Sequence, residues 1–261
     1  MQQPLITLPT LTSGLGELGV SHGSTLMVHC SMSSFGHIHG GAQTVIEALM
    51  STVGEGGTIV MPTLTNGRFD PSEWQNPPVP EDQWHRIRFE TPAFHPLKTP
   101  TDHTMSTVYE LFRTWPGVVR TDHPHSSVAA WGRYRDQIVN VHKLDERFGN
   151  ASPLGVLYDL DAQVLFLGTT YSTNTCFHLA EYRQPNPPVR EFMIVQGAPG
   201  RRRLITYQDV DTDSSVFELI GTDFEKHCRV QISSIGLACC RLFSFKAAVD
   251  FTVDWLAEPT T

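Results

Sequence analysis

A chain of 261 residues, 40% of them hydrophobic and 18% charged, can bury a substantial core without disulfides or metals. Its apolar runs fall short of the roughly 20 residues that a membrane-spanning helix needs, so we expect no membrane partner. A formal net charge of −8 argues against nucleic acid, whose binding depends on Lys and Arg contacts to phosphates, and it permits a cationic ligand.

The cysteines and the N-terminal segment indicate a reducing compartment. Five scattered cysteines form no CxxC pair, which suits free thiols better than a disulfide framework. The first twenty residues lack the basic and apolar regions of a signal peptide. We therefore expect a cytoplasmic protein, and the sequence leaves open whether it forms a homodimer.

The first quarter of the chain predicts a βαβ unit. A short helix over 10–19 is followed by an apolar run at 25–29 that is typical of a buried strand. A loop of small residues at 31–41 comes next, then helical spacing over 43–53, and a second strand at 58–62. This order predicts parallel pairing of the two strands in a layered α/β structure.

The remainder predicts one domain over residues 1–261, interrupted by a long loop at about 64–104. Such a loop inside a compact domain is usually functional, and we place it on the substrate side. The other predicted elements are helices at 105–115, 134–142 and 175–182, strands at 128–131, 164–168, 191–196 and 203–207, and a C-terminal helical stretch.

Two segments could carry chemistry. The loop at 31–41 would present backbone N–H groups at a helix N-terminus, which favours an anion, although an ordinary βα connection explains it as well. After the strand that ends at Gly168, His178 and Glu181 are three residues apart and share one face of a helix. A carboxylate beside an imidazole suits a general base. The alternatives are a surface ion pair, or metal ligands together with His29.

Two polar segments are less specific. Residues 120–127 contain two histidines and a proline-fixed turn, and could hold a ligand or only their own backbone. Residues 209–213 contain three aspartates, which could attract a cation or form a solvated edge.

Taken in order, these segments resemble the aminoglycoside 3-N-acetyltransferase family. The stretches that carry the resemblance are Val28-His29-Cys30-Ser31, residues 57–63, Glu110-Leu111-Phe112-Arg113, residues 120–132, residues 149–153, Leu165-Phe166-Leu167-Gly168 and Thr175-x-x-His178-x-x-Glu181. Each is short, but seven in the same order are specific.

The resemblance implies a three-layer α/β/α fold with a central, mostly parallel or mixed sheet. It also implies acetyl-CoA as co-substrate and, as acceptor, the 3-amino group of 2-deoxystreptamine aminoglycosides, a reaction that confers antibiotic resistance. His178 would be the general base, Glu181 would orient it, and Thr175 would help to stabilise the oxyanion. The residues that would bind the cofactor are His29, Ser31, Ser33, Ser34, Phe35, Gly36, Gly40, Gly41, Arg120, His123 and Ser127.

A cationic amine calls for carboxylates in its pocket. Chemistry and region suggest Asp70, Glu73, Asp209, Asp211 and Asp213. One departure bears on the acceptor, because Phe94-His95-Pro96 stands where the family usually has Phe-Asp-Pro. The sequence therefore keeps two alternatives: the same fold and donor with a non-antibiotic amine, and a metal-dependent hydrolase that uses His29, His178 and Glu181.

Overall fold

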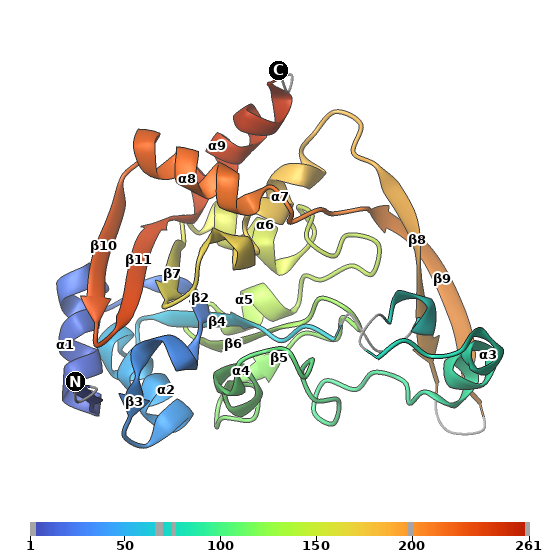
Figure 1. Cartoon of the computed structure of the whole chain (residues 1–261), viewed down its shortest axis with the longest axis horizontal. Coiled ribbons are helices and arrows are strands. Elements are labelled where there is room, and N and C mark those ends of the chain that lie inside the picture. Colours follow the sequence, from blue (N-terminus) through green and yellow to red (C-terminus); the bar gives the residue numbers. More distant parts are fainter. Residues whose placement is uncertain (1–3, 66–69, 75–76, 198–200, 259–261) are drawn as a thin grey trace.

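The computed structural model describes residues 4–65, 70–74, 77–197 and 201–258 (Figure 1). A seven-stranded sheet has the order β10-β11-β7-β2-β4-β6-β5, in which β7, β2 and β4 are parallel and the flanking strands antiparallel. Its strands are β2 (Thr25–Cys30), β4 (Thr58–Pro62), β5 (Val119–Arg120), β6 (Val128–Gly132), β7 (Gln163–Leu167), β10 (Val230–Ile235) and β11 (Ala238–Ser244). The predicted parallel pairing of the first two strands is confirmed.

Helices cover both faces of this sheet and complete three layers. One face packs against α1 (Leu8–Leu18), α2 (Gly41–Val53) and α4 (Thr107–Phe112). The other packs against α5 (Arg135–Val139), α6 (Pro153–Asp159), α7 (Phe177–Tyr182), α8 (Phe217–His227) and α9 (Phe245–Ala257). Along β2 the buried side chains alternate between the two cores, with Leu26 and Val28 on one side and Met27 on the other. The three-layer fold with a mixed sheet is confirmed.

Smaller elements lie outside these layers. β1 (Leu5–Ile6) pairs in parallel with β3 (His37–Ile38), and η1 (Met32–Phe35), η3 (Pro71–Glu73) and η4 (Tyr171–Thr173) are short 3₁₀ turns. In Figure 1 the antiparallel hairpin of β8 (Val189–Gln196) and β9 (Arg203–Val210) lies to one side of the sheet, next to α3 (Glu81–Glu90). None of the described helices has the length and apolar character needed to cross a membrane.

The segment predicted as a long loop contains the ten-residue helix α3. None of its side chains is buried, so the apolar spacing that reveals a packed helix is missing. Glu81 and Asp82 in the first turn and Arg88 in the last favour the helix through its dipole. The hairpin of β10 and β11 and the helix α8 were also not predicted; the hairpin extends the sheet beside β7.

Gly221 in α8 allows a close approach to Tyr171 of η4, just ahead of α7. A Cβ at position 221 would lie 1.9 Å from Cγ of the buried Tyr171 ring. Gly16 in α1 is different, because a Cβ there would meet nothing within 4 Å.

We therefore expect Gly221→Ala to lower the free energy of unfolding by about 2 kcal/mol or more, because the backbone of α8 must move away from η4. The matched helix variant Gly16→Ala should raise it by about 0.4–1 kcal/mol through the entropy of the unfolded chain. Urea unfolding of both variants measures the difference, and equal stabilities would contradict the packing argument.

Candidate functional site

The short helix α7 pairs His178 with Glu181. Nδ1 of His178 lies 2.6 Å from Oε2 of Glu181, as their spacing predicted. The other carboxylate oxygen accepts a hydrogen bond of 2.7 Å from the backbone N–H of Asp213, in the segment after β9. Both oxygens of Glu181 are therefore held, and Nε2 is the ring nitrogen left outside the pair.

Two aromatic rings pack against the imidazole. Phe148 is stacked on His178 at a centroid distance of 4.6 Å and an interplanar angle of 18°, and Phe217 lies 4.8 Å away. The side chains of His178 and Glu181 keep 16% and 14% of their surface exposed. The imidazole is thus fixed in position but still accessible to a small molecule.

His178 opens into a cavity of about 240 Å³. Thr175, predicted as its neighbour in function, lines the same cavity. Among the residues that the structure describes, those that line the cavity are Leu64, His125, Arg147, Phe148, Thr175, His178, Arg190, Phe192, Thr212 and Ser214. They come from the loops that follow β4, β5 and β7, from the segment after α5, and from the β8–β9 hairpin and the segment after it.

A buried ion pair builds one wall of this cavity. The backbone N–H and Nε of Arg147 donate to Oδ2 of Asp209 at 2.9 and 3.1 Å, and Nη2 donates to the carbonyl of Val210. The hydroxyl of Tyr182 at the end of α7 donates to Oδ1 of Asp209 at 2.7 Å. The pair therefore joins the segment before α6, the end of β9 and the helix that bears His178.

Comparison with known proteins identifies the family. The family model for aminoglycoside 3-N-acetyltransferases matches residues 27–257. The chain belongs to this family. It is 43% identical over 253 residues to YokD of Bacillus subtilis (strain 168), an SPbeta prophage-derived aminoglycoside N(3')-acetyltransferase-like protein, with 95% of this chain and 92% of YokD covered.

Solved structures of family members agree with the fold. The crystal structure of YokD has a TM-score of 0.94 at 41% identity and covers 98% of this chain and 94% of that one. AAC-IIIb in a binary complex with CoASH has a TM-score of 0.87 at 27% identity, covering 99% and 100% of the two chains. AAC-VIa bound to sisomicin has a TM-score of 0.85 at 26% identity, covering 97% and 98%.

Most carboxylates predicted for the acceptor site of this family member are already engaged. Asp209 is 4% exposed and receives the hydrogen bonds of Arg147, Tyr182 and Val210, so its carboxylate is held by the protein, and its role as a substrate ligand stays a prediction. The other predicted carboxylates also have partners. Asp211 pairs with Arg190, Asp213 binds Ser215, and Asp70 binds Ser72 and Arg88.

The hydrogen bonds from Ser72 and Arg88 hold the pKa of Asp70 below its usual value, although partial burial opposes them. The side chain of Glu73 lies outside the described residues.

The predicted cofactor loop at 31–41 contains η1 and β3. Ser33 and Gly40 are exposed, and Ser31, Gly36 and Gly41 are partly exposed. The hydroxyl of Ser34 donates to the carbonyl of Gly168 at 2.7 Å, which ties the loop to the end of β7. Two predicted contacts face inward instead: Phe35 is fully buried in the core, and His29 is 2% exposed beneath the loop.

Three further residues predicted to bind the cofactor, Arg120, His123 and Ser127, are buried. Arg120 is 5% exposed, and its guanidinium donates to the carbonyls of Thr63 and Thr99 and to the hydroxyl of Ser127. Ser127 is itself buried against Thr63. His123 is 1% exposed; its Nδ1 accepts from two backbone N–H groups and its Nε2 contacts the carbonyl of Leu144. These side chains make contacts within the protein that hold the loop carrying His125.

Within the described part of the chain, no group of three or more His, Cys, Asp and Glu side chains could hold a metal ion. His29, His178 and Glu181 therefore do not form the metal site that the hydrolase alternative requires. Cys176 is fully buried, and burial raises the pKa of its thiol well above the usual range, so it is not an activated nucleophile.

His95, which departs from the family pattern, forms a turn. Its Nδ1 accepts from the N–H of Leu97 at 3.2 Å and its carbonyl accepts from Thr99. The neighbouring Phe94 ring lies 5.0 Å from the guanidinium carbon of Arg120. The histidine thus shapes the chain beside a buried arginine and is not among the residues that line the cavity.

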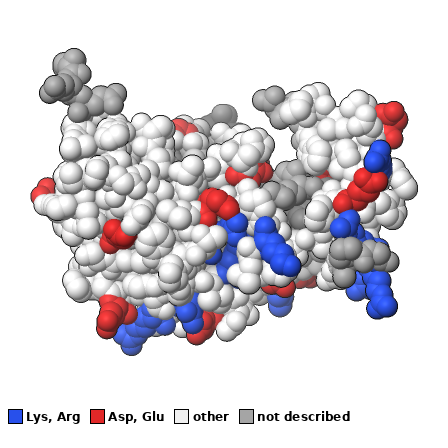
Figure 2. All heavy atoms as spheres, turned by 90° about the horizontal axis from the view of Figure 1, so that it is seen from below, with Lys and Arg blue, Asp and Glu red and all other residues white. Residues whose placement is uncertain are grey.

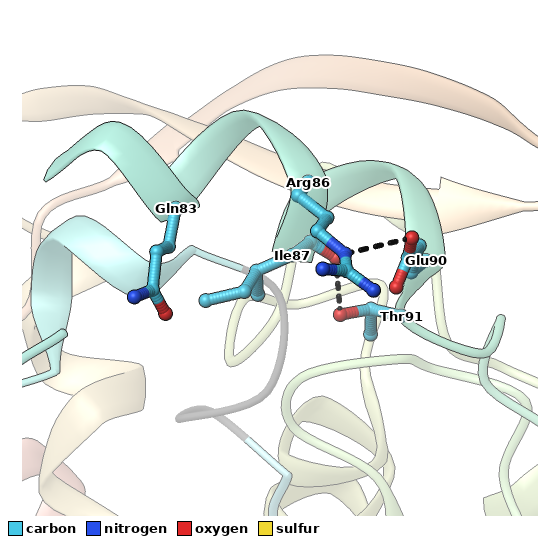
Figure 3. A pocket seen from close by; sticks show the side chains of 5 residues that line it. All are labelled: Gln83, Arg86, Ile87, Glu90 and Thr91. Carbon is cyan, nitrogen blue, oxygen red and sulfur yellow. Dashed lines mark hydrogen bonds and ion pairs between the residues drawn. The ribbon is translucent and has the colours of Figure 1, made fainter. Parts of the chain in front are cut away.

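A larger hollow of about 510 Å³ lies along α3 and shares no lining residue with the cavity at His178. Figure 3 shows Gln83, Ile87, Glu90 and Thr91 beneath this helix. Nε of Arg86 is 3.0 Å from Oε1 of Glu90 across one helical turn. The described residues that line the hollow all come from α3 and the residue after it, and among them there are no convergent groups like those around His178.

Sequence reasoning missed Arg147, Phe148, Arg190 and Phe192. No motif surrounds them, and their importance follows from contacts with residues far along the chain, such as Asp209 with Arg147. His125 was within the predicted polar segment but was not selected; its Nδ1 lies 2.7 Å from the hydroxyl of Tyr207 in β9.

The buried pair gives a sharp stability test. Asp209→Ala should lower the free energy of unfolding by about 3–5 kcal/mol, because Arg147 would remain buried without its carboxylate. The matched variant Asp211→Ala breaks an exposed pair with Arg190 and should cost less than about 1 kcal/mol. Denaturant unfolding measures both, and a small loss for Asp209→Ala would show that the buried pair is not what holds these segments.

Three buried histidines and the partly buried His142 predict loss of stability in acid. Burial lowers the pKa of His29 to about 3, of His123 to about 2, and of His125 and His142 to about 4, from an ordinary value of 6.5. The folded state keeps these rings neutral while the unfolded chain takes up protons. Their stabilisation is therefore complete above about pH 6.5 and is lost as the pH falls towards the folded values.

We expect the free energy of unfolding to fall from about pH 7 to about pH 5 by up to about 1.4 kcal/mol per pH unit for each buried ring. His142→Gln should flatten this slope by nearly one proton, whereas His227→Gln, at an exposed site, should leave it unchanged. Urea titrations across this pH range measure the slopes. Equal slopes in the wild type and in His142→Gln would contradict the assignment.

Proposed function

We propose that this chain transfers an acetyl group from acetyl-CoA to the amine of a small acceptor, with His178 as the general base. The observation that carries the proposal is the 2.6 Å contact between His178 and Glu181 at the mouth of a cavity, in a chain of the acetyltransferase family. Glu181 favours the tautomer with the proton on Nδ1, which leaves Nε2 free to accept one.

The pair solves a protonation problem. An ammonium group has no lone pair with which to attack, so the acceptor first releases one proton to solvent, and the nitrogen of the neutral amine then loses a second proton as its bond to carbon forms and the bond from carbon to sulfur breaks. Nε2 of His178 takes that proton while Glu181 stabilises the imidazolium, and the ring then returns the proton to the departing sulfur. Stacking on Phe148 and the Asp213 hydrogen bond to Glu181 hold this geometry before the acceptor arrives.

Thr175 and the 31–41 loop support the donor side. Thr175 lines the cavity with His178, so its hydroxyl is the group we propose for stabilising the oxyanion. Acetyl-CoA supplies the activated carbonyl. Ser31, Ser33 and the positive-φ Gly36, Gly40 and Gly41 offer hydroxyls and open backbone at the carboxyl end of β2, which fits a long polar cofactor. The complex of the family member AAC-IIIb with CoASH supports this assignment.

The acceptor has two candidates. The sisomicin bound to AAC-VIa favours the 3-amino group of 2-deoxystreptamine aminoglycosides, and acetylation there would confer antibiotic resistance. A non-antibiotic amine is favoured by a different observation: the described residues that line the cavity include two arginines and neither Asp nor Glu. Acetyl transfer itself does not depend on which acceptor is right.

His178→Ala should lower kcat for acetyl transfer about 10²–10⁴-fold, because the acceptor amine loses its proton acceptor. Release of the CoA thiol from acetyl-CoA, measured across diverse amines that include aminoglycosides, gives the rate. Calorimetric binding of CoA should be retained, which separates loss of chemistry from loss of fold.

His227→Ala is the matched control, since His227 is exposed at the end of α8 and should leave kcat unchanged. Full activity of His178→Ala would reject the general base. A purified chain that acetylates no amine in the panel would reject the function.

A further inference from the structure

The cavity beside His178 has a basic wall. Of the ten described residues that line it, Arg147 and Arg190 carry a fixed positive charge and none is Asp or Glu. The outer surface has no comparable bias on the face shown in Figure 2, where acidic and basic side chains lie next to one another.

The guanidinium of Arg147 is held by the protein through Nε and Nη2, and its Nη1 remains as a donor to a ligand. Its Nε binds Asp209 and its Nη2 binds the carbonyl of Val210, while its guanidinium carbon lies 3.9 Å from the centre of the Phe192 ring. Among the described residues Nη1 has no protein partner. A guanidinium fixed in this way donates to a carboxylate or phosphate without further ordering.

Arg190 brings a second charge to the same place. Its guanidinium carbon lies 4.2 Å from the centre of the Phe192 ring, and its Nε is 3.0 Å from Oδ1 of Asp211. After burial, the charges of Arg147 and Arg190 are the next causes that lower the pKa of His125, to about 4. Both guanidinium groups are therefore close to one imidazole, which stays neutral near neutral pH.

The described carboxylates near this cavity already have partners. Asp209 is buried and pairs with Arg147, Asp211 pairs with Arg190, Glu181 binds His178, and Asp213 binds Ser215. An ammonium group of a polycation in the cavity would have to compete with these partners, and it would meet the two guanidinium groups that line the cavity. Like charges brought together out of water oppose binding.

We propose that the acceptor is an amine that also carries an acidic group, a carboxylate or a phosphate, and that Arg147 and Arg190 bind this group in the cavity. The inference rests on the proposed acetyl transfer. The phosphates of CoA are the other source of such an anion. They are separated from the thioester by the pantetheine chain, and the thioester must meet the amine at His178, so the acceptor is the better match.

Matched amines test the class of acceptor. Phosphoethanolamine against ethanolamine, and 2-aminoethylphosphonate against ethylamine, differ in the acidic group and share a primary amine. We expect kcat/KM in the thiol-release assay to be at least about 10-fold higher for the acidic member of a pair, the value of one charge-assisted hydrogen bond. Equal rates within both pairs, or preference for an aminoglycoside over all four amines, would overturn the inference.

Arg190→Gln tests the residues, because Arg190 is 41% exposed and its loss should not unfold the chain. The KM for phosphoethanolamine should rise about 10-fold or more, with a much smaller change in kcat. Arg203→Gln is the matched control on the same hairpin, since Arg203 contacts Gln196 and does not line the cavity. If the KM for acetyl-CoA rises instead, the anion belongs to the cofactor and the inference fails.

A binding measurement separates this inference from the proposed function. Calorimetry with phosphoethanolamine and no acetyl-CoA should detect binding to the wild type and to Arg203→Gln, and about 10-fold weaker binding to Arg190→Gln. Equal binding by all three overturns the inference, even if acetyl transfer is observed. Binding that depends on Arg190 in a chain that acetylates no amine would uphold the anion site and reject the transferase.

Discussion

The buried contact between Arg147 and Asp209 joins the parts of the site that come from different regions of the chain. Asp209 also receives the hydroxyl of Tyr182, at the end of the helix that bears His178. Phe148, next to Arg147, stacks on the imidazole. One ion pair thus fixes the position of α7, the aromatic support of His178 and the wall of the cavity. Its burial makes the pairing obligatory, since an unpaired charge in that position would cost several kcal/mol.

The central sheet determines where the residues around His178 lie. Because β2, β4 and β7 are parallel, their carboxyl ends meet at one edge, and the 31–41 loop and the segment leading to α7 both leave from it. The hydroxyl of Ser34 bonds the first of these loops to Gly168 at the end of β7. The β8–β9 hairpin then brings Arg190 and Phe192 from outside the sheet. The loop proposed to bind the cofactor and the helix of the proposed base therefore leave the sheet at the same edge, although they are far apart in sequence.

Membership in the family bears on which reaction is catalysed, whereas the charge of the cavity bears on which acceptor binds. The family and the His178–Glu181 pair concern the reaction, which depends on a proton acceptor beside a thioester. The two arginines concern the acceptor, which must fit the charge of the wall it touches. The same fold can keep the reaction and change the acceptor, because the cavity wall comes largely from a hairpin outside the central sheet and from the loop before α6.

The sequence by itself determined the parallel βαβ unit and the spacing of His178 and Glu181, because apolar periodicity and contacts within one helical turn are local properties. The three-layer fold followed from the resemblance of seven ordered stretches to the family. Sequence reasoning missed α3, whose polar surface carries no such periodicity. It assigned Asp209 to the substrate and Arg120 and His123 to the cofactor, because residue type alone does not reveal burial or partners. Only the tertiary structure decided that Asp209 faces Arg147 across 62 positions of sequence, and that the cavity wall at His178 is basic. Contacts at that separation depend on how sheet, hairpin and loops pack, and short motifs do not record them.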